Sequence, residues 1–367
     1  MRADLPARVA AAIERCECPS LVLDLARVEA NALAIAAAAR AHGITPLFAA
    51  KSCPHPAVRA IAARVLSGFD AASSGEVAEL AAFTIGTLSI VDPGGRAGAT
   101  ADHARATRII VGCETVAQVS AAPLRAAIAI RLSASIVPRD PAVGAVQDGS
   151  GHRRSRFGLD LEPGRQRDVI AAMVRAADGR AVGVHVHHGA VSATTGERFA
   201  ASAHAALAAA RAAGLEPAFV NAGGAWHAVA DLAAAFAELR AAVPPATEIL
   251  VEPGRAVTRG AGFATGRVIV ARELDDRALR ITDVSRICHL RWSTIDLVGP
   301  APHPGTGHRV LVVGPTCFEE DVLGEWTIDP LLLAVGARIT LRDVSGYALA
   351  WNAPFGGVPA ASVVAVD

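Results

Sequence analysis

Short apolar runs alternate with alanine-rich stretches along most of the chain, from about residue 45 to residue 255. A short apolar run bounded by turn residues predicts a buried strand, and a longer stretch with helical periodicity predicts a helix. Regular alternation of the two is typical of a parallel sheet, and eight strand–helix units close into a barrel. We therefore predict an α/β fold with a (β/α)8 TIM-like barrel, whose strands lie at 47–51, 68–73, 87–91, 108–111, 126–132, 181–187, 218–221 and 248–251.

The helical pattern disappears after residue 257. Short runs rich in β-branched residues replace it, at 267–271, 278–282, 309–313 and 338–341, and they favour a separate β domain. A strand at 21–23 precedes the barrel and is expected to join that domain. We predict an N-terminal segment (1–25), a barrel (26–256) and a C-terminal β domain (257–367).

Two kinds of segment connect the predicted barrel strands. Helices are expected at 75–82, 114–119, 197–213 and 228–242. The stretch 136–155 is different, because its prolines and glycines fit no regular element. We interpret it as a long active-site loop or a short irregular helix.

Composition and charge exclude several classes of protein. The 367 residues suffice for a large core and two domains. Acidic and basic residues number 35 each, so no global positive field attracts nucleic acid or an anionic membrane. No apolar run is long enough to span a bilayer, and the first 17 residues lack the apolar core of a signal peptide. The six cysteines are scattered, unlike those of a zinc ribbon or a disulfide scaffold, so we expect a cytoplasmic protein.

Lysine is almost absent from the chain. Lys51 is the single lysine beside 34 arginines, a bias in which most tolerant lysine positions have become arginine. Arginine can replace the charge of a lysine, but only an amine can lose its proton and form a Schiff base with a carbonyl. Because Lys51 also ends an apolar run, we predict that it holds an aldehyde cofactor. The alternative is a surface lysine that remained by chance.

Polar residues follow many of the predicted strands. In barrels of this type, chemistry lies at the C-terminal ends of the strands. Polar side chains at so many of these ends indicate that they converge on a ligand. In chain order they are Lys51, Asp70, Arg131, His187, the pair Gly223-Gly224 and the segment Glu252-Pro253-Gly254-Arg255.

Some of these residues also have simpler interpretations. Asp70 begins an ordinary strand-to-helix turn, in which Ser74 is a candidate helix cap. His185, His187 and His188 suggest a metal site, but no cysteine or acidic ligand motif accompanies them. We therefore predict no metal and assign His187 to stacking on a planar ring.

The combination points to pyridoxal 5′-phosphate. This cofactor needs an amine for its aldehyde, an anion site for its phosphate and a partner for its pyridine nitrogen. Lys51 supplies the amine. Backbone N–H groups after a seventh barrel strand often bind phosphate, so Gly223, Gly224 and Arg255 are assigned to the anion site. Glu252 is assigned to the pyridine nitrogen.

The chain resembles the alanine-racemase-fold (fold type III) decarboxylases, the family of ornithine, arginine and diaminopimelate decarboxylases. The resemblance covers nearly the whole sequence. Its motifs are weak singly, and their order and spacing make them specific. They lie at 48–51, 68–76, 183–189, 221–224, 252–255, 314–321 and 346–348.

The resemblance implies a pyridoxal 5′-phosphate-dependent carboxy-lyase that decarboxylates an amino acid. All the strand-end residues named above, including Asp70, Arg131 and Gly254, are then expected to bind the cofactor. Tyr347, the only tyrosine in the chain, is implied to help hold the phosphate. Racemases of this fold place an arginine where this chain has Glu252, so the glutamate favours decarboxylation.

The resemblance also implies a head-to-tail homodimer with shared active sites. Cys317 and Asp321 would enter the partner's site, and Cys317 would donate a proton to the product carbon. The alternative for Cys317 is a buried, small apolar residue, as most free cysteines are.

The substrate end of the predicted site departs from the family. The position after Cys317 often carries an acidic residue that contacts the distal ammonium, and here it is Phe318. An unpaired charge buried beside a phenyl ring would be costly. Glu319, Glu320 and Asp321 are the remaining carboxylates of this loop.

Two further departures are the replacement of a usual serine by Ala190 and a rearranged closing motif at 351–357. Arg153, Arg154 and Arg156 could bind a substrate carboxylate. We therefore expect a non-standard diamino acid or a conjugated amino acid of specialised metabolism. The alternatives are an ordinary ornithine, lysine or diaminopimelate decarboxylase, an amino-acid racemase, and a catalytically silent homologue.

Overall fold

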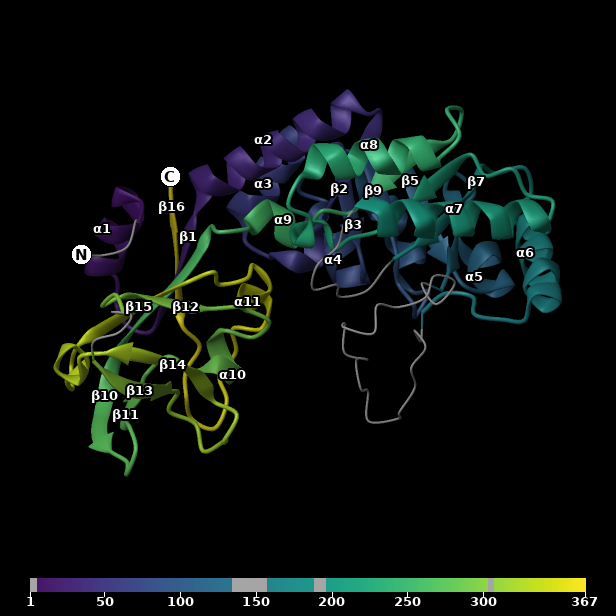
Figure 1. The fold of residues 1–367 in the computed structure, drawn as a ribbon. Coiled ribbons are helices and arrows are strands. Elements are labelled where there is room, and N and C mark those ends of the chain that lie inside the picture. The colour runs from purple at the N-terminus through teal and green to yellow at the C-terminus, as the bar shows by residue number, and fades with distance from the viewer. Residues whose placement is uncertain (1–4, 134–156, 188–195, 303–306) are drawn as a thin grey trace. The chain divides into compact units, whose positions relative to one another are not determined.

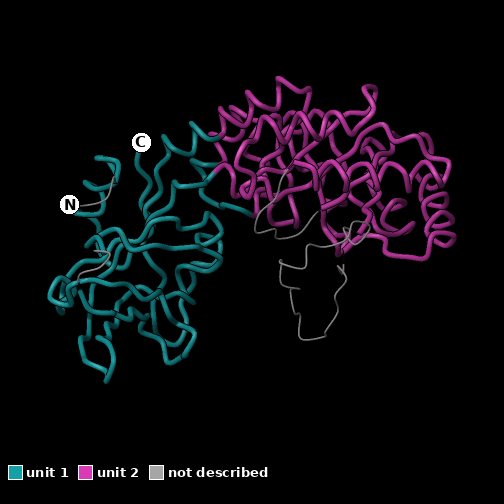
Figure 2. Tube along the Cα trace, in the orientation of Figure 1, with its two compact units in different colours: residues 1–31, 52–58, 258–367 teal, residues 32–51, 59–257 magenta. Residues whose placement is uncertain are grey.

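The computed structural model describes residues 5–133, 157–187, 196–302 and 307–367 (Figure 1). The chain divides into two compact units, of which unit 1 comprises residues 1–31, 52–58 and 258–367, and unit 2 comprises residues 32–51 and 59–257 (Figure 2). The predicted loop at 136–155 lies outside the described residues. Within the described ranges, no helix has both the length and the apolar character needed to cross a membrane.

The predicted barrel is confirmed. Eight parallel strands pair with their neighbours in chain order, and β2 pairs with β9 to close the barrel. The strands are β2 (Ile44–Ala49), β3 (Gly68–Ala71), β4 (Thr84–Ile90), β5 (Arg105–Cys113), β6 (Ala127–Leu132), β7 (Val182–Val186), β8 (Phe219–Asn221) and β9 (Glu248–Val251).

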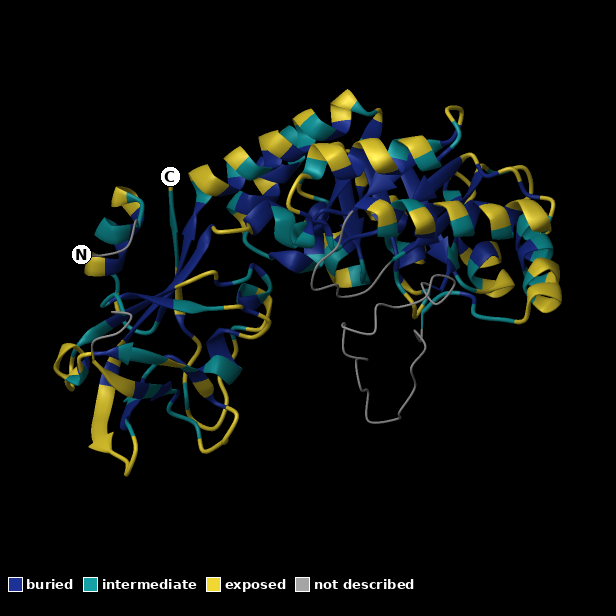
Figure 3. Ribbon diagram, in the orientation of Figure 1, coloured by how far each residue is buried: buried dark blue, intermediate teal, exposed yellow. Residues whose placement is uncertain are grey.

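Helices follow most of these strands. The strands are mostly buried, and most surrounding helices carry both exposed and buried residues (Figure 3). Helix α2 (Leu25–Ala41) precedes the first barrel strand. The helices that follow strands are α3 (Pro56–Val65), α4 (Ser74–Leu80), α5 (Val116–Ala121), α6 (Pro163–Ala177), α7 (Gly196–Ala212), α8 (Leu232–Ala242) and α9 (Arg255–Thr258). Short 3-10 helices are η1 (Ala50–Ser52), η2 (Ala97–His103) and η4 (Trp226–Ala228).

Two local predictions need correction. The strand that carries the lysine ends at Ala49, so Lys51 lies in η1 and not at the strand's end. The cap of α4 is Ser73, whose hydroxyl accepts a hydrogen bond from the backbone N–H of Glu76, and not Ser74. Ser73 has the extended backbone that an N-cap needs, whereas Ser74 is already helical.

The barrel interior is layered because inward-facing side chains recur at every second residue of a strand. At the N-terminal end, Arg108 pairs with both carboxylate oxygens of Glu248 at 2.8 and 2.7 Å, and its guanidinium lies over the ring of Phe219. Above this pair lies an apolar layer, made of Leu47, Ile110, Ala129, Phe219 and Leu250.

Unit 1 is built around a separate sheet of eight strands. Its order is β12-β15-β10-β11-β13-β14, and β1 pairs with both β10 and β16. The strands are β1 (Ser20–Asp24), β10 (Gly262–Glu273), β11 (Ala278–Thr282), β12 (Asp296–Gly299), β13 (His308–Val313), β14 (Val322–Ile328), β15 (Arg338–Arg342) and β16 (Ser362–Val366).

Short helices complete unit 1. Helix α1 (Ala7–Arg15) packs Val9, Ala12 and Ile13 against Val22 of β1 and Phe263 of β10. The others are α10 (Arg286–His289), η5 (Pro330–Leu333) and α11 (Tyr347–Ala350). The apolar core of the unit joins these helices to the sheet, since it includes Leu290, Leu333 and Ala348 beside strand residues.

Candidate active site

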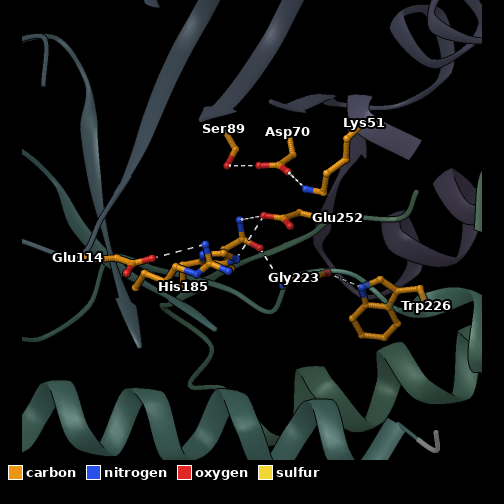
Figure 4. Close-up of polar contacts among 10 residues, drawn as sticks. Lys51, Asp70, Ser89, Glu114, His185, Gly223, Trp226 and Glu252 are labelled. Atoms are coloured by element: carbon orange, nitrogen blue, oxygen red, sulfur yellow. Dashed lines mark hydrogen bonds and ion pairs between the residues drawn. The ribbon is translucent and has the colours of Figure 1, made fainter. Parts of the chain in front are cut away.

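Polar side chains replace the apolar layer at the C-terminal end of the barrel. Each lies two residues beyond a residue of that layer and therefore faces the same way. The pairs are Ala129 and Arg131, Phe219 and Asn221, and Leu250 and Glu252. Figure 4 shows that Lys51, Asp70, His185 and Glu252 converge. Along each of these strands, an apolar residue that packs the barrel interior is followed two residues later by a polar residue of the site.

Lys51 is paired with a buried carboxylate. Its Nζ lies 3.1 Å from Oδ2 of Asp70, and the hydroxyl of Ser89 donates to Oδ1 at 3.0 Å (Figure 4). Asp70 is fully buried, whereas the Lys51 side chain is 35% exposed. The amine is therefore oriented by its ion pair and remains accessible to a ligand. Asp70 accepts from both of these partners, so it is placed to orient the lysine.

Glu252 is a buried carboxyl group with one oxygen engaged. Asn221 Nδ2 donates to its Oε1 at 2.7 Å, and the Asn221 side-chain oxygen accepts from the N–H of Gly223 at 2.9 Å. Burial and the nearby Asp70 raise the pKa of Glu252 to about 8, against the opposing effect of Lys51. A carboxyl group with this pKa retains a proton near neutral pH that a basic nitrogen can share.

The turn after β8 brings backbone close to His187. Gly223 has φ +68°, and a Cβ added there would lie 2.9 Å from the Cα of His187. A Cβ on Gly224 would lie 3.0 Å from His187 Nε2. The turn is held by Trp226, whose Nε1 donates to the Gly223 carbonyl at 2.7 Å. Glycine is therefore required at a place where backbone and an imidazole ring meet.

Arg131 is held on both sides. Its Nη1 lies 3.6 Å from Oε1 of Glu114, and its guanidinium lies 4.7 Å from the ring centroid of Phe157. At the end of β9, the carbonyl of Gly254 accepts from the N–H of Val257 at 3.0 Å, and Arg255 begins α9. Arg156, which we assigned to the substrate, lies outside the described residues.

The predicted cysteine loop belongs to unit 1 and connects β13 to β14. Cys317, Glu319 and Glu320 are exposed, so the interpretation of Cys317 as a buried packing residue is wrong. Phe318 is 47% exposed, and its ring lies 5.3 Å from that of Phe355. The loop thus presents a thiol and an aromatic pair.

Asp321 differs from the rest of the loop because it is buried within unit 1. Its carboxylate accepts from the N–H of Arg286 at 2.6 Å, from the Ser285 hydroxyl at 3.1 Å and from the Thr316 hydroxyl at 2.7 Å. The loop backbone closes around it, since Gly314 N–H donates to the Asp321 carbonyl at 2.7 Å. These contacts anchor the loop.

Tyr347 is the first residue of α11 in unit 1. Its ring lies 5.2 Å from that of Trp292, edge to face. The preceding Gly346 lies against the segment that follows Lys51 in the chain, because a Cβ there would be 2.6 Å from the Ser52 carbonyl oxygen and 3.0 Å from Cys53 Cβ. Close packing therefore fixes the start of α11.

The sequence did not predict four contacts in the barrel. Ser89 donates to Asp70, Glu114 lies beside Arg131, and both His185 and Asn221 contact Glu252. Alternation along a strand could have identified His185 and Asn221, because each lies two residues beyond a position that faces the barrel interior. Nothing in the sequence pairs Ser89 with Asp70, which requires the register of β3 and β4. The described residues contain no group of three or more side chains arranged to hold a metal ion.

The barrel residues fit pyridoxal 5′-phosphate. An accessible amine, a buried carboxyl group and a glycine turn without room for a side chain lie in one polar layer. Both ring nitrogens of the buried His185 lack hydrogen-bond partners, as expected of a site shaped for a ligand. The amine suits the aldehyde and the carboxyl suits the pyridine nitrogen.

Comparisons with known proteins agree with this fit. Residues 25–259 match the family model described as pyridoxal-dependent decarboxylase, pyridoxal binding domain. Comparison with curated protein sequences gives no match. Similar solved structures align with nearly the whole of this chain and of their own chains. Because their sequence identity to this chain is so low, they establish the fold alone.

Three of these structures show the extent of the likeness. Lysine/ornithine decarboxylase from Vibrio vulnificus, complexed with putrescine, is 19% identical with TM-score 0.76, covering 98% of this chain and 97% of its own. Arginine decarboxylase of Paramecium bursaria Chlorella virus is 16% identical with TM-score 0.78, covering 98% of each chain. Diaminopimelate decarboxylase from Helicobacter pylori, complexed with L-lysine, is 17% identical with TM-score 0.75, covering 98% and 94%.

Proposed function

The chain belongs to the family of pyridoxal-dependent decarboxylases, which are carboxy-lyases that use pyridoxal 5′-phosphate, and on that premise we propose that it decarboxylates a non-standard amino acid. The observation that supports this chemistry is the polar layer, in which the amine of Lys51 lies near the buried carboxyl group of Glu252, above an apolar layer. When bound, the cofactor supplies an electron sink for the electron pair that stays on the α-carbon when carbon dioxide leaves.

We assign roles to the barrel residues accordingly. Lys51 binds the cofactor aldehyde, and Asp70 orients the amine through its 3.1 Å contact. Glu252 would hold a proton against the pyridine nitrogen when the cofactor is bound. His187 stacks on the ring beside the glycine turn, while Gly223, Gly224 and Arg255 provide the phosphate site. Arg131, which belongs to the same layer, and Gly254 are also assigned to cofactor binding.

The identity of the residue at Glu252 supports decarboxylation over racemisation. A proton held between this carboxyl group and the pyridine nitrogen makes the ring a strong electron sink, as loss of carbon dioxide requires. An arginine at this place would leave the nitrogen unprotonated. The raised pKa of Glu252 favours this role, because the carboxyl group is still protonated near neutral pH and can share that proton with the nitrogen.

Cys317 is proposed to donate the proton that replaces the carboxylate. Its exposure on the loop of unit 1 supports a role outside its own core. Shared active sites in a homodimer would deliver this loop to the partner's barrel. Tyr347 is proposed to help hold the phosphate. Replacing Cys317 by Ala should then preserve cofactor binding and slow turnover or divert protonation to by-products.

We infer a substrate other than free ornithine or lysine from Phe318. Its half-exposed ring, paired with Phe355, offers an apolar surface where an acidic residue would be needed for a distal ammonium. Asp321 is unavailable as a substitute because its carboxylate is buried and bonded within unit 1. Glu319 remains the nearest exposed acidic candidate. A diamino acid conjugated to another group satisfies these conditions, with Arg156 as a candidate carboxylate ligand.

Three further assignments belong to this proposal. The protein acts in the cytoplasm, in amino-acid metabolism. Its working form is a homodimer. Its domains are the N-terminal segment (1–25), the barrel (26–256) and the β domain (257–367), which completes the active site across the dimer.

The experiment has two parts. Purified protein loaded with pyridoxal 5′-phosphate should show the visible absorbance of a lysine-bound cofactor, and Lys51→Ala should lose this band while remaining folded. Carbon dioxide release is then measured for lysine, ornithine, arginine, meso-diaminopimelate and larger conjugated amino acids. A colourless protein that takes up no cofactor contradicts the assignment of the site.

The two parts separate chemistry from specificity. Proton exchange at the α-carbon in heavy water without carbon dioxide release would identify a racemase. Turnover of free ornithine or lysine with kcat/KM of roughly 10⁴ M⁻¹s⁻¹ or more would refute the substrate proposal and leave decarboxylation standing.

A further inference from the structure

His185 is an unusual residue of the barrel because it is buried without hydrogen bonds. Its side chain is 1% exposed, and neither Nδ1 nor Nε2 has a hydrogen-bond partner among the described residues. Buried polar groups are nearly always bonded, so an unpartnered imidazole calls for a physical reason. The roles assigned above leave this histidine unused.

Its position follows from the strand register. His185 lies on β7, opposite Arg131 of β6 on one side and Asn221 of β8 on the other. It therefore belongs to the polar layer that contains Glu252 (Figure 4). The Nε2 atom of His185 lies 3.4 Å from Oε1 of Glu252.

The two oxygens of Glu252 have different surroundings. Oε1 accepts from Asn221 at 2.7 Å and faces His185. Oε2 accepts no hydrogen bond from the described part of the chain. One oxygen is therefore directed to protein donors, and the other is left for a ligand.

The charge state of His185 suits a donor that must not compete with a ligand cation. Burial lowers its pKa well below the usual value, and the positive charges of Arg131, His187 and Lys51 act in the same direction. Among the described residues, Glu252 also bears on it, with Oε1 3.4 Å from its Nε2. A neutral imidazole with its proton on Nε2 donates to a carboxylate and adds no positive charge.

We propose that His185 is a positioning residue for the cofactor: its Nε2–H donates to Oε1 of Glu252 and, with Asn221, turns Oε2 toward the pyridine nitrogen. The inference rests on the proposed pairing of Glu252 with that nitrogen. The 3.4 Å separation is longer than an ordinary hydrogen bond, as catalytic contacts often are before the ligand is bound.

The test uses His185→Phe, which keeps a planar ring without a donor, and His185→Gln, which restores an uncharged N–H donor. His204→Phe is the control, because His204 is exposed on α7 of the same unit. Affinity for pyridoxal 5′-phosphate is measured by absorbance titration without substrate. The pH at which the bound cofactor's absorbance changes is recorded on the same samples.

His185→Phe should weaken cofactor affinity by about tenfold or more, as loss of a hydrogen bond to a charged group implies. It should also move the pH midpoint of the absorbance. His185→Gln should recover most of both, and His204→Phe should match the wild type. Wild-type affinity and an unmoved midpoint in His185→Phe would overturn the proposal. So would a His185→Gln variant that folds like wild type but behaves like His185→Phe.

Glu252→Gln distinguishes failure of this inference from failure of the proposed site. If Glu252→Gln changes the cofactor's affinity and absorbance but His185→Phe does not, only the role of His185 is wrong. If Glu252→Gln leaves both unchanged, the pairing with the pyridine nitrogen is wrong and this inference falls with it. Neither measurement depends on the identity of the amino-acid substrate.

Discussion

At the scale of single residues, Asp321 acts through the loop that surrounds it. Its carboxylate accepts from backbone and hydroxyl donors of Ser285, Arg286 and Thr316, all within unit 1. Ser285 in turn caps α10, and the N–H of Ser285 donates to Nδ1 of the buried His289. We infer that Asp321 fixes the loop and so determines where Cys317 and Phe318 are presented.

Asp321→Asn should therefore destabilise unit 1 although it preserves the shape of the side chain. The new amide presents N–H donors to groups that are themselves donors, at a cost of roughly 2–3 kcal/mol. Thermal unfolding measures the effect. The exposed neighbour provides the control, and Glu320→Gln should leave the melting temperature unchanged. Equal melting temperatures for both variants would contradict an anchoring role.

Glu252 should make the stability of the cofactor-free protein depend on pH. Its pKa is raised from 4.5 to about 8 by burial and Asp70. A carboxyl group with a raised folded-state pKa contributes stability that is complete below pH 4.5 and is lost as pH rises through 8. The shift corresponds to roughly 5 kcal/mol. Melting temperatures of wild type and Glu252→Gln between pH 5 and 9 should therefore converge at low pH and diverge at high pH in favour of the variant. Parallel curves would contradict the shift.

The residues that sequence reasoning identified are those with distinctive chemistry. Lys51 could be found because it is the only lysine, and Glu252 because it follows a strand within a specific motif. His185 and Asn221 were not assigned these contacts because their roles depend on which strands are neighbours. The burial of Asp321 depends on a contact with Ser285, 36 residues earlier. Such partners are set by tertiary register, which local pattern does not contain.

At the scale of elements, apolar runs located the barrel strands within a few residues because those strands are buried on both faces. Unit 1 was harder. Strands β12, β14 and β16 and helix α1 were not predicted. Strand β14 mixes exposed and buried residues, and β16 has no fully buried residue, so neither is a buried apolar run. These strands form through pairing, which for β16 joins β1 across the length of the chain.

The turn after β8 gives a prediction at this scale. Gly223→Ala should weaken cofactor binding at least tenfold, because its new Cβ meets the Cα of His187 at 2.9 Å and displaces the ring. Gly214→Ala is the matched control, with φ +78° but no atom within 4 Å of the added Cβ. Both variants carry the strain of a left-handed alanine, roughly 1–2 kcal/mol. Cofactor titration and melting temperature separate the two effects, and equal cofactor affinity would remove the turn from the site.

At the scale of the whole molecule, the proposed site draws on both units. Lys51 and Glu252 belong to unit 2, whereas Cys317 and Tyr347 belong to unit 1. If the loop of one subunit serves the barrel of another, an inactive barrel and an inactive loop can complement each other. Mixing subunits tests this arrangement without further structural information.

Equal amounts of Lys51→Ala and Cys317→Ala subunits, dissociated and reassociated, should regain about a quarter of wild-type activity. Random pairing makes half of the dimers mixed, and each of these has one intact site. Lys51→Ala mixed with Glu252→Gln should regain nothing, since both substitutions fall in the barrel. Activity no greater than the sum of the separate variants would show that the sites are not shared.

The isolation of Lys51 also provides a chemical reporter. A lysine-specific endoprotease has a single cleavage point in this chain, after Lys51, and releases fragments 1–51 and 52–367. That bond lies in a short 3-10 helix between two barrel strands, so cleavage requires local opening. The protease recognises a free lysine side chain, so it should not cleave after a lysine whose amine is bonded to the cofactor aldehyde. Digestion on a gel should therefore report cofactor occupancy, because the loaded chains stay uncut over the time in which the cofactor-free protein is cleaved.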